Sequence, residues 1–339
     1  MKNPNKNYNI TLSGNNNFSN NANKLFNRNL VKNNHSNFMK LKPPVNRGNS
    51  SSREITLYVP QGLGDIFWIY QKFSLHFDKI NFTILATSEG KVSSRAIDWI
   101  KLFPKCGEIK MKKVSQATYN SNINGLHKMQ SIMSVYQMGQ GQYFYYACNK
   151  HLEEGKRIED IDSEYPYEET VAIETSKVEL PFDKYLVIYV SGNAMKEDNN
   201  LWNISKWEQF FVKLNKEVTN LPVVIIGASY DQDSVHSLEK VFKENKVPYY
   251  SLVDKMPSQV CYVLKNSQGF IGYQSGLNIM ADNFDVNQFM LYFPVLEKMM
   301  YTWCKSKNAN TKYFAKTFNS SIDECINLIS DNNIFVNKI

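Results

Sequence analysis

Two short glycine turns in the sequence have the residue types and the spacing to bind a phosphorylated ligand. Gly62-Leu63-Gly64-Asp65 follows the apolar run ITLYVP, and Gln274-Ser275-Gly276 follows the run GFIGY. Glycine lets a backbone approach a ligand closely, and the first turn of a helix presents free N–H groups and a positive dipole end to anions. Asp65 adds a carboxylate that could accept a proton from an attacking hydroxyl.

Several common nucleotide and metal signatures are missing from the sequence. It contains neither the GxGxxG of a dinucleotide site nor the GxxxxGK[ST] of a P-loop. Its five cysteines include no CxxC pair, which argues against a disulfide framework or a zinc site. Asp160-Ile161-Asp162 is a DxD string of the kind used in metal-dependent sugar transfer, but it lies in a charged stretch and we interpret it as a solvated segment.

Both turns belong to series in which strands alternate with helices. The first series has expected strands at 55–60, 82–86 and 108–112, with helices at 66–77 and 96–103 between them. Residues 119–169 show only a weak pattern. The second series has strands at 185–192, 221–227, 248–252, 269–273 and 288–293, with helices between them. This alternation predicts an α/β fold with parallel sheets, in which ligands bind at the carboxyl ends of the strands.

One helix of the second series has a strong start signal. Ser205 and Glu208 have the spacing of a capping box, and an apolar face follows it at Trp207, Phe210, Phe211 and Leu214. A further helix is expected at about 234–245, another from Pro257, and another through Met280. The segment 184–293 is therefore predicted to be a complete repeating β/α unit.

The length of 339 residues fits two domains of ordinary size. We expect an N-terminal Rossmann-like acceptor domain at 54–180 and a C-terminal Rossmann-like donor domain at 181–339. Residues 1–53 are rich in Asn and Ser, with nine Lys or Arg and no acidic residue, and we interpret them as a disordered basic tail. Because this tail holds more positive charge than the formal net charge of +7 for the whole chain, the remainder is close to neutral.

Composition also suggests a compartment. No apolar run has the length of a membrane span, and the N-terminus lacks the hydrophobic core of a signal peptide. The odd number of widely spaced cysteines favours a reducing environment. We therefore expect a cytoplasmic protein.

These features together resemble the heptosyltransferase family of GT-B nucleotide-sugar glycosyltransferases, over roughly residues 55–335. The resemblance depends on GLGD after the first strand, SGNAMKEDNNLWNISKWEQF, LPVVIIGASYDQD and IGYQSGLNIMA, and on their order and spacing. It implies a GT-B fold, in which two Rossmann-like domains face a central cleft.

The resemblance implies a role for each turn. Asp65 matches the general base that acts on the acceptor hydroxyl, although it could equally cap a helix beginning at Ile66. Ser275, Gly276 and Leu277 match the turn whose N–H groups hold the donor pyrophosphate. We assign Gly64 and Gln274 to the same donor site.

The resemblance also implies three further donor-binding residues. Ser191 and Lys196 lie in the loop expected to face the phosphates, although Lys196 could be an ordinary solvated lysine. Asp231 lies where the family often has an acid near the donor nucleoside, but it could instead cap the helix before Ser234.

The chain departs from the family pattern at three positions. Gln274 replaces an acidic residue, Ile279 replaces a histidine, and Asn200 or Leu201 replaces a lysine before the Trp. Two of the family's ionic contributors to donor binding are therefore missing, which leaves open whether the chain is active.

The resulting hypothesis is an inverting, metal-independent glycosyltransferase. It needs no cofactor, uses a nucleoside diphosphate sugar as co-substrate, and transfers a hexose or heptose to a hydroxyl of a glycan. One alternative keeps the fold but transfers to a modified base in DNA, with the basic tail tracking phosphates. A second alternative is a relative that binds a nucleotide or a glycan without transferring a sugar.

Overall fold

The structure is a computed structural model that describes residues 54–75, 77–87, 94–115, 170–190, 202–273, 275–292, 313–317 and 319–335. All of these belong to one compact unit, residues 49–339. The expectations for the tail at 1–53 and for the DxD string lie outside the described residues.

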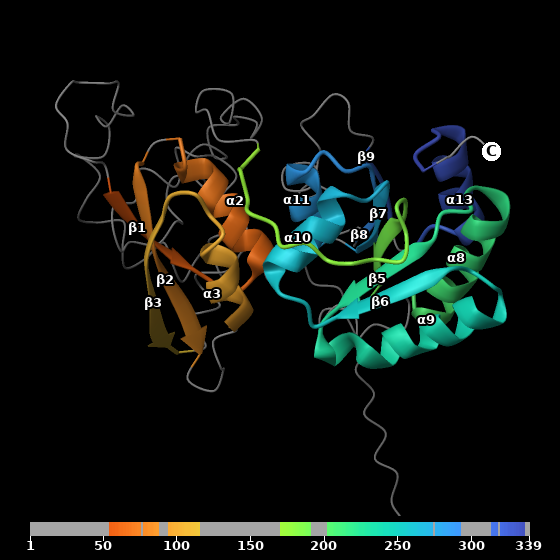
Figure 1. The fold of residues 1–339 in the computed structure, drawn as a ribbon, viewed down its shortest axis with the longest axis horizontal. Coiled ribbons are helices and arrows are strands. Elements are labelled where there is room, and N and C mark those ends of the chain that lie inside the picture. Colours follow the sequence, from red (N-terminus) through yellow and green to blue (C-terminus); the bar gives the residue numbers. More distant parts are fainter. Residues whose placement is uncertain are drawn as a thin grey trace, which may run out of the picture. The chain divides into compact units, whose positions relative to one another are not determined.

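The first β/α series forms a three-stranded parallel sheet in the order β1-β2-β3 (Figure 1). Its strands are β1 (Glu54–Val59), β2 (Lys79–Thr87) and β3 (Cys106–Val114), joined by the helices α2 (Leu63–Phe73) and α3 (Ser94–Ile100). The parallel arrangement predicted from the sequence is confirmed. Helix α2 begins at Leu63 and not at Ile66, because the glycine turn itself forms the first helical turn.

Aromatic side chains fill the core beside this sheet. Phe67 and Tyr70 on α2 pack against Phe103, with ring centroids 5.8 and 4.4 Å apart, and Phe67 also lies 5.4 Å from Trp99. All four side chains are buried. Aromatic burial on this scale fixes α2 and α3 against the strands, and with them the turn that begins α2.

The second series forms a six-stranded parallel sheet in the order β6-β5-β4-β7-β8-β9. The strands are β4 (Leu186–Tyr189), β5 (Val223–Gly227), β6 (Tyr249–Val253), β7 (Gly269–Tyr273), β8 (Gln288–Tyr292) and β9 (Tyr313–Thr317). The chain starts at β4, proceeds outward to β6, and returns to β7 on the other side of β4. The strand order therefore reverses between β4 and β7, and this switch point is where open α/β sheets bind ligands.

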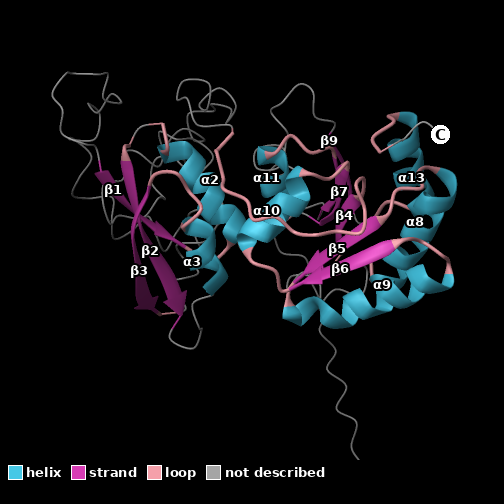
Figure 2. Ribbon diagram, viewed as in Figure 1, coloured by secondary structure: helices cyan, strands magenta, loops and turns pink. Residues whose placement is uncertain are grey.

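Helices cover both faces of the second sheet (Figure 2). One face packs against α8 (Ile204–Glu217), α9 (Gln232–Glu244) and α13 (Ile322–Asp331), and the other against α10 (Pro257–Lys265) and α11 (Gly276–Asn283). All four residues of β4 are buried, with Leu186 and Ile188 in one apolar cluster and Val187 and Tyr189 in the other. This burial on both faces is the reason that the strand is apolar throughout.

The predicted capping box of α8 is wrong. The helix begins at Ile204, its N-cap is Asn203, and the Asn203 side chain accepts a hydrogen bond of 3.0 Å from the Lys206 N–H. Ser205 therefore lies inside the helix, and Glu208 accepts instead from the Ser237 hydroxyl on α9 at 2.5 Å. Asn and Ser are comparable as N-caps, so the S-x-x-E spacing alone could not separate them.

Strand β9 and helix α13 were not predicted from the sequence. Strand β9 is a short edge strand at the end of the sheet. Helix α13 did carry a readable signal, because Ser321 and Glu324 form a capping box in which the Glu324 N–H donates to the Ser321 hydroxyl at 3.2 Å.

Candidate functional site

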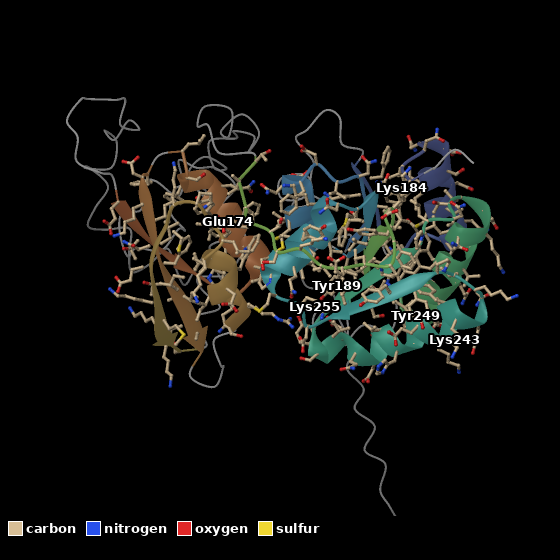
Figure 3. All side chains as sticks on the ribbon, viewed as in Figure 1. Glu174, Lys184, Tyr189, Lys243, Tyr249 and Lys255 are labelled. Carbon is tan, nitrogen blue, oxygen red and sulfur yellow. The ribbon has the colours of Figure 1, made fainter. Side chains whose placement is uncertain are left out.

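The switch point places one of the two glycine turns at the carboxyl end of β7. Tyr273 is the last residue of β7, and α11 begins at Gly276. Tyr189 ends the neighbouring strand β4, and Lys255 follows the end of β6. Figure 3 labels both side chains at the carboxyl ends of the strands. The N-terminus of α11 therefore lies at the carboxyl end of β7, which is where open α/β sheets generally bind ligands.

The N-terminus of α11 is a well-formed helix cap. Ser275 is the N-cap, and its hydroxyl accepts a hydrogen bond of 3.3 Å from the Leu277 N–H. The Ser275 N–H donates to Asn278 Oδ1 at 2.7 Å. Asn278 is completely buried, and its Nδ2 has no hydrogen-bond partner among the described residues. A buried amide donor without a partner, beside a positive helix end, suits an anionic oxygen.

The other glycine turn forms the N-terminus of α2. Gly62 is its N-cap, with an extended backbone and no side-chain cap hydrogen bond. The alternative that Asp65 caps a helix at Ile66 is therefore wrong, because Asp65 lies in the first turn of α2. The Leu63 carbonyl accepts a hydrogen bond of 3.0 Å from Trp99 Nε1 on α3, which holds this turn in place.

The Asp65 carboxyl group is mostly withdrawn from water. A Cβ placed on Gly62 would lie 2.5 Å from Asp65 Oδ2, so the carboxylate folds back over this glycine. Burial raises the pKa of Asp65 to about 6, although the side chain keeps partial exposure. A carboxyl group with this pKa can exchange protons near neutral pH, as a general base must.

The two helix N-termini meet at their glycines. A Cβ on Gly64 would lie 2.6 Å from the Gly276 Cα, and a Cβ on Gly276 would lie 2.5 Å from the Gly64 nitrogen. The glycine at 276 is therefore required by the contact with α2, whereas the sequence suggested only close approach to a ligand. The contact places Asp65, the next residue after Gly64, beside the turn that begins α11.

Ile279 completes this contact. Its Cδ1 lies 3.0 Å from the Cβ position of Gly64, and its side chain is buried. The position at which the family pattern has a histidine therefore contributes an apolar contact between the two helices in this chain.

A buried hydrogen-bond network joins the end of β7 to the start of α8. The Tyr273 hydroxyl donates to the Trp202 carbonyl at 2.6 Å and accepts from Trp207 Nε1. Trp202 Nε1 in turn donates to the Ser320 carbonyl at 3.1 Å. The two Trp residues belong to a segment that was identified from the sequence, whereas the role of Tyr273 was not predicted, because an apolar strand does not indicate what a hydroxyl group at its end contacts.

Asp231 lies at the carboxyl end of β5. It ends the 3-10 turn η3 (Ser229–Asp231), and its buried Oδ2 accepts from the Ala228 N–H at 2.8 Å. Its Oδ1 has no partner among the described residues. Asp231 occupies the N-cap position of α9 but makes no cap hydrogen bond there, so the capping alternative is wrong.

Two tyrosines lie beside Asp231. The hydroxyls of Tyr189 and Tyr230 share a hydrogen bond, and burial, followed by the charge of Asp231, raises the pKa of both. Both hydroxyls therefore stay protonated. Tyr230 is half exposed, so its ring is available to a ligand at this edge of the sheet.

The remaining predicted site residues fall outside the described part of the chain. These residues are Ser191, Lys196, Asn200 and Gln274. Within the described ranges, no group of three or more His, Cys, Asp or Glu side chains could hold a metal ion. No helix among them is long and apolar enough to cross a membrane.

Comparison with known proteins gives a match in structure only. No protein-family model matches the sequence, and no curated protein matches it significantly. The E. coli heptosyltransferase WaaC with ADP has a TM-score of 0.51 at 10% identity, over 82% of this chain and 99% of WaaC. A glycosyl transferase family 9 protein from Veillonella parvula has a TM-score of 0.51 at 11% identity, over 86% of this chain and 99% of that protein.

A third solved structure agrees with these two. The E. coli ADP-heptose lps heptosyltransferase II has a TM-score of 0.51 at 10% identity, over 83% of this chain and 98% of that one. Each of the three alignments covers at least 82% of this chain and at least 98% of the solved structure. The chain therefore has the heptosyltransferase-like GT-B fold that the sequence resemblance implies.

Proposed function

We propose that this protein is a nucleotide-sugar-dependent glycosyltransferase that inverts the anomeric centre and works without a metal ion. The observation that carries the proposal is the contact between Gly64 and Gly276. It brings a carboxyl group with a pKa of about 6 beside a helix N-terminus at the switch point of a parallel sheet. A proton acceptor next to an anion-binding turn is the arrangement that transfer from a sugar diphosphate needs.

The donor diphosphate is proposed to bind at the N-terminus of α11. Ser275, Gly276 and Leu277 would offer backbone N–H groups, and the buried Asn278 Nδ2 would offer a further donor. Ser191, Lys196 and Gln274 would complete this end of the site. The solved WaaC structure contains ADP, which supports a nucleoside diphosphate as the ligand class of this fold.

The donor nucleoside is proposed to lie over the carboxyl ends of β4 and β5. Asp231 Oδ1 has no hydrogen-bond partner within the described part of the chain, and it would accept hydrogen bonds from ribose hydroxyls, since a buried carboxylate oxygen is costly without a partner. Tyr230 would pack its exposed ring against the base or the ribose.

Asp65 is proposed to act as the general base. It would accept the proton of an acceptor hydroxyl while the hydroxyl oxygen bonds to the anomeric carbon. The bond from that carbon to the diphosphate oxygen breaks at the same time, and the nucleoside diphosphate leaves on the opposite face of the sugar. A single displacement of this kind inverts the anomeric configuration. The dipole of α11 would stabilise the negative charge that develops on the leaving group.

The acceptor is proposed to be a hydroxyl group on a glycan. A DNA acceptor depends on the basic residues of 1–53, and none of the described residues favours it. The binding-only alternative follows from the uncharged Gln274 and Ile279, and only a turnover measurement separates it from an enzyme.

A two-part experiment tests the proposal. Nucleoside diphosphates and nucleotide sugars are first screened for an increase in melting temperature, because a ligand that binds only the folded state stabilises it by mass action. Ligands that bind are then supplied as labelled donors, and release of nucleoside diphosphate is followed with a panel of glycan acceptors. Binding with turnover supports the enzyme, binding without turnover on any acceptor supports the binding-only relative, and no binding contradicts both.

A further inference from the structure

Among the residues that the structure describes, one ion pair links the N-terminal series to the C-terminal series. The guanidinium group of Arg95, the second residue of α3, pairs with Asp254 Oδ1 directly after β6. The other ion pairs in the described part of the chain each join groups within one series or within the connector, residues 170–183, which precedes β4. Arg95 also lies near Tyr189 and Tyr230. Burial raises the pKa of both hydroxyls, and the charge of Arg95 lowers both by a smaller amount.

The backbone holds the Asp254 carboxylate in a fixed position. Asp254 has φ 58, a left-handed conformation that Asp and Asn adopt more readily than other residues with a side chain. Its N–H donates to the Gly227 carbonyl at 3.0 Å, and its Oδ1 accepts from the Ser229 N–H at 3.0 Å. The carboxylate is therefore oriented by the loops after β5 and β6 independently of Arg95.

Arg95 is connected to the proposed base through α3. Trp99 lies one turn further along this helix, is completely buried, and donates from Nε1 to the Leu63 carbonyl at 3.0 Å. Leu63 begins α2, two residues before Asp65. A displacement of α3 would thus reach the Asp65 turn through a short chain of packed groups.

We propose that Arg95 is a positioning residue for sugar transfer, which holds Asp65 against the donor turn by fixing α3 to Asp254. This inference rests on the proposed function. The Arg95 and Asp254 side chains are 31% and 49% exposed. Exposed ion pairs contribute little, typically less than about 1 kcal/mol, so the expected change in kcat on breaking the pair is about two- to fivefold.

Four variants separate this role from a general effect on stability. Arg95→Gln removes the cation, and Asp254→Asn removes the charge while keeping an oxygen for the Ser229 N–H and a residue that tolerates φ 58. The double variant tests whether the two act together. Lys213→Gln is the matched control, because Lys213 is 33% exposed and pairs with Asp323 within the C-terminal series.

Each variant is measured by kcat, by donor affinity in calorimetric titration, and by hydrogen exchange at the Ile66 and Phe67 amides of α2. We expect Arg95→Gln and Asp254→Asn each to lower kcat about two- to fivefold, with the double variant no worse than either. Donor affinity should stay within about twofold, and Arg95→Lys should recover part of the activity. Exchange at the α2 amides should become faster in both single variants and stay unchanged in Lys213→Gln.

Additive losses, a loss confined to donor affinity, or equal effects in Lys213→Gln would each overturn the inference. The exchange measurement keeps it separate from the proposed function, because exchange does not need turnover. Faster exchange in a protein that turns over no nucleotide sugar would contradict the proposed function and leave the coupling between Asp254 and α2 in place. Unchanged exchange in an active enzyme would contradict the coupling between Asp254 and α2 and leave the proposed function in place.

Discussion

Gly64 and Gly276 touch through their backbones, with no room for a side chain on either. A Cβ at position 276 would lie 2.5 Å from the Gly64 nitrogen and 3.0 Å from its Cα. These are backbone atoms, so relief requires movement of a whole helix. The two glycines therefore set the distance between the helix N-termini that would hold the base and the donor.

Replacing either glycine with alanine should push these helices apart. We expect Gly276→Ala to lower the free energy of unfolding by about 1–3 kcal/mol, as overpacking does in a dense interior, and to reduce sugar transfer more than donor binding. Urea denaturation and calorimetric titration measure the two effects. Gly227→Ala is the control for stability, because its Cβ would find its closest neighbours at 3.3 Å. Equal stability of Gly276→Ala and the wild type would contradict a direct backbone contact between Gly64 and Gly276.

The raised pKa of Asp65 predicts a pH-dependent cost to stability. Burial raises this pKa to about 6, above the value of about 3.9 in an unfolded chain. The folded state therefore binds the Asp65 proton more tightly than the unfolded chain does. The contribution of this proton to the free energy of unfolding is complete below about pH 4 and is lost as the pH rises through about 6.

Asp65→Asn removes this titration. The variant and the wild type should differ little near pH 4, and the variant should become the more stable one between about pH 4 and pH 7. The gain is at most about 3 kcal/mol, and smaller to the extent that solvent screens the partly exposed carboxylate. Urea unfolding at several pH values measures it. A difference that does not change with pH would mean that Asp65 titrates normally in the folded protein.

The Tyr273 hydroxyl should contribute measurably to stability. Tyr273→Phe leaves Trp207 Nε1 and the Trp202 carbonyl without this partner, and both tryptophans are buried. We expect a loss of about 1–3 kcal/mol in the free energy of unfolding. A buried donor or acceptor that loses its partner destabilises the fold by more than an intact hydrogen bond stabilises it. Tyr185→Phe is the matched control, since its hydroxyl donates one hydrogen bond of 3.0 Å to the Val263 carbonyl. A smaller loss in Tyr273→Phe than in Tyr185→Phe would contradict the prediction.

Asn283 should anchor the connector between the two series. Its Oδ1 accepts from the Val171 N–H at 2.7 Å, and its Nδ2 donates to the Val171 carbonyl at 3.0 Å. Asn283→Leu loses both bonds, whereas Asn283→Asp keeps the acceptor for the N–H. Limited proteolysis at residues 170–183 should therefore be fastest in the Leu variant and intermediate in the Asp variant. Cleavage at the wild-type rate in the Leu variant would show that other contacts hold the connector.

The strands were predictable because their signals are local. The runs LVIY of β4, VVIIG of β5 and GFIGY of β7 are apolar over their whole length, since helices cover both faces of the sheet. The boundaries of α2 and α8 were less predictable. The N-cap of α2 is Gly62, although Asp65 also suits that role. The N-cap of α8 is Asn203, although Ser205 suits it equally. Which residue caps each helix depends on the geometry of the preceding turn.

The candidate site was predictable in its positions but not in its contacts. The two glycine turns could be identified from the sequence, because each follows a strand. Their contact with one another joins residues 64 and 276, and no local pattern reports such a distant pair. For the same reason, Asn278, Tyr273 and Arg95 were missed, since each acquires its role from a partner in another element.

The turnover number of Asp65→Asn, measured together with its donor affinity, tests most directly whether Asp65 is the general base. The Asn side chain keeps the size of the original and loses the ability to accept a proton. We predict that calorimetric titration gives a donor affinity close to that of the wild type, while kcat falls by about two to four orders of magnitude. A kcat near the wild-type value, in a variant that binds donor normally, would contradict the assignment of Asp65 as the general base.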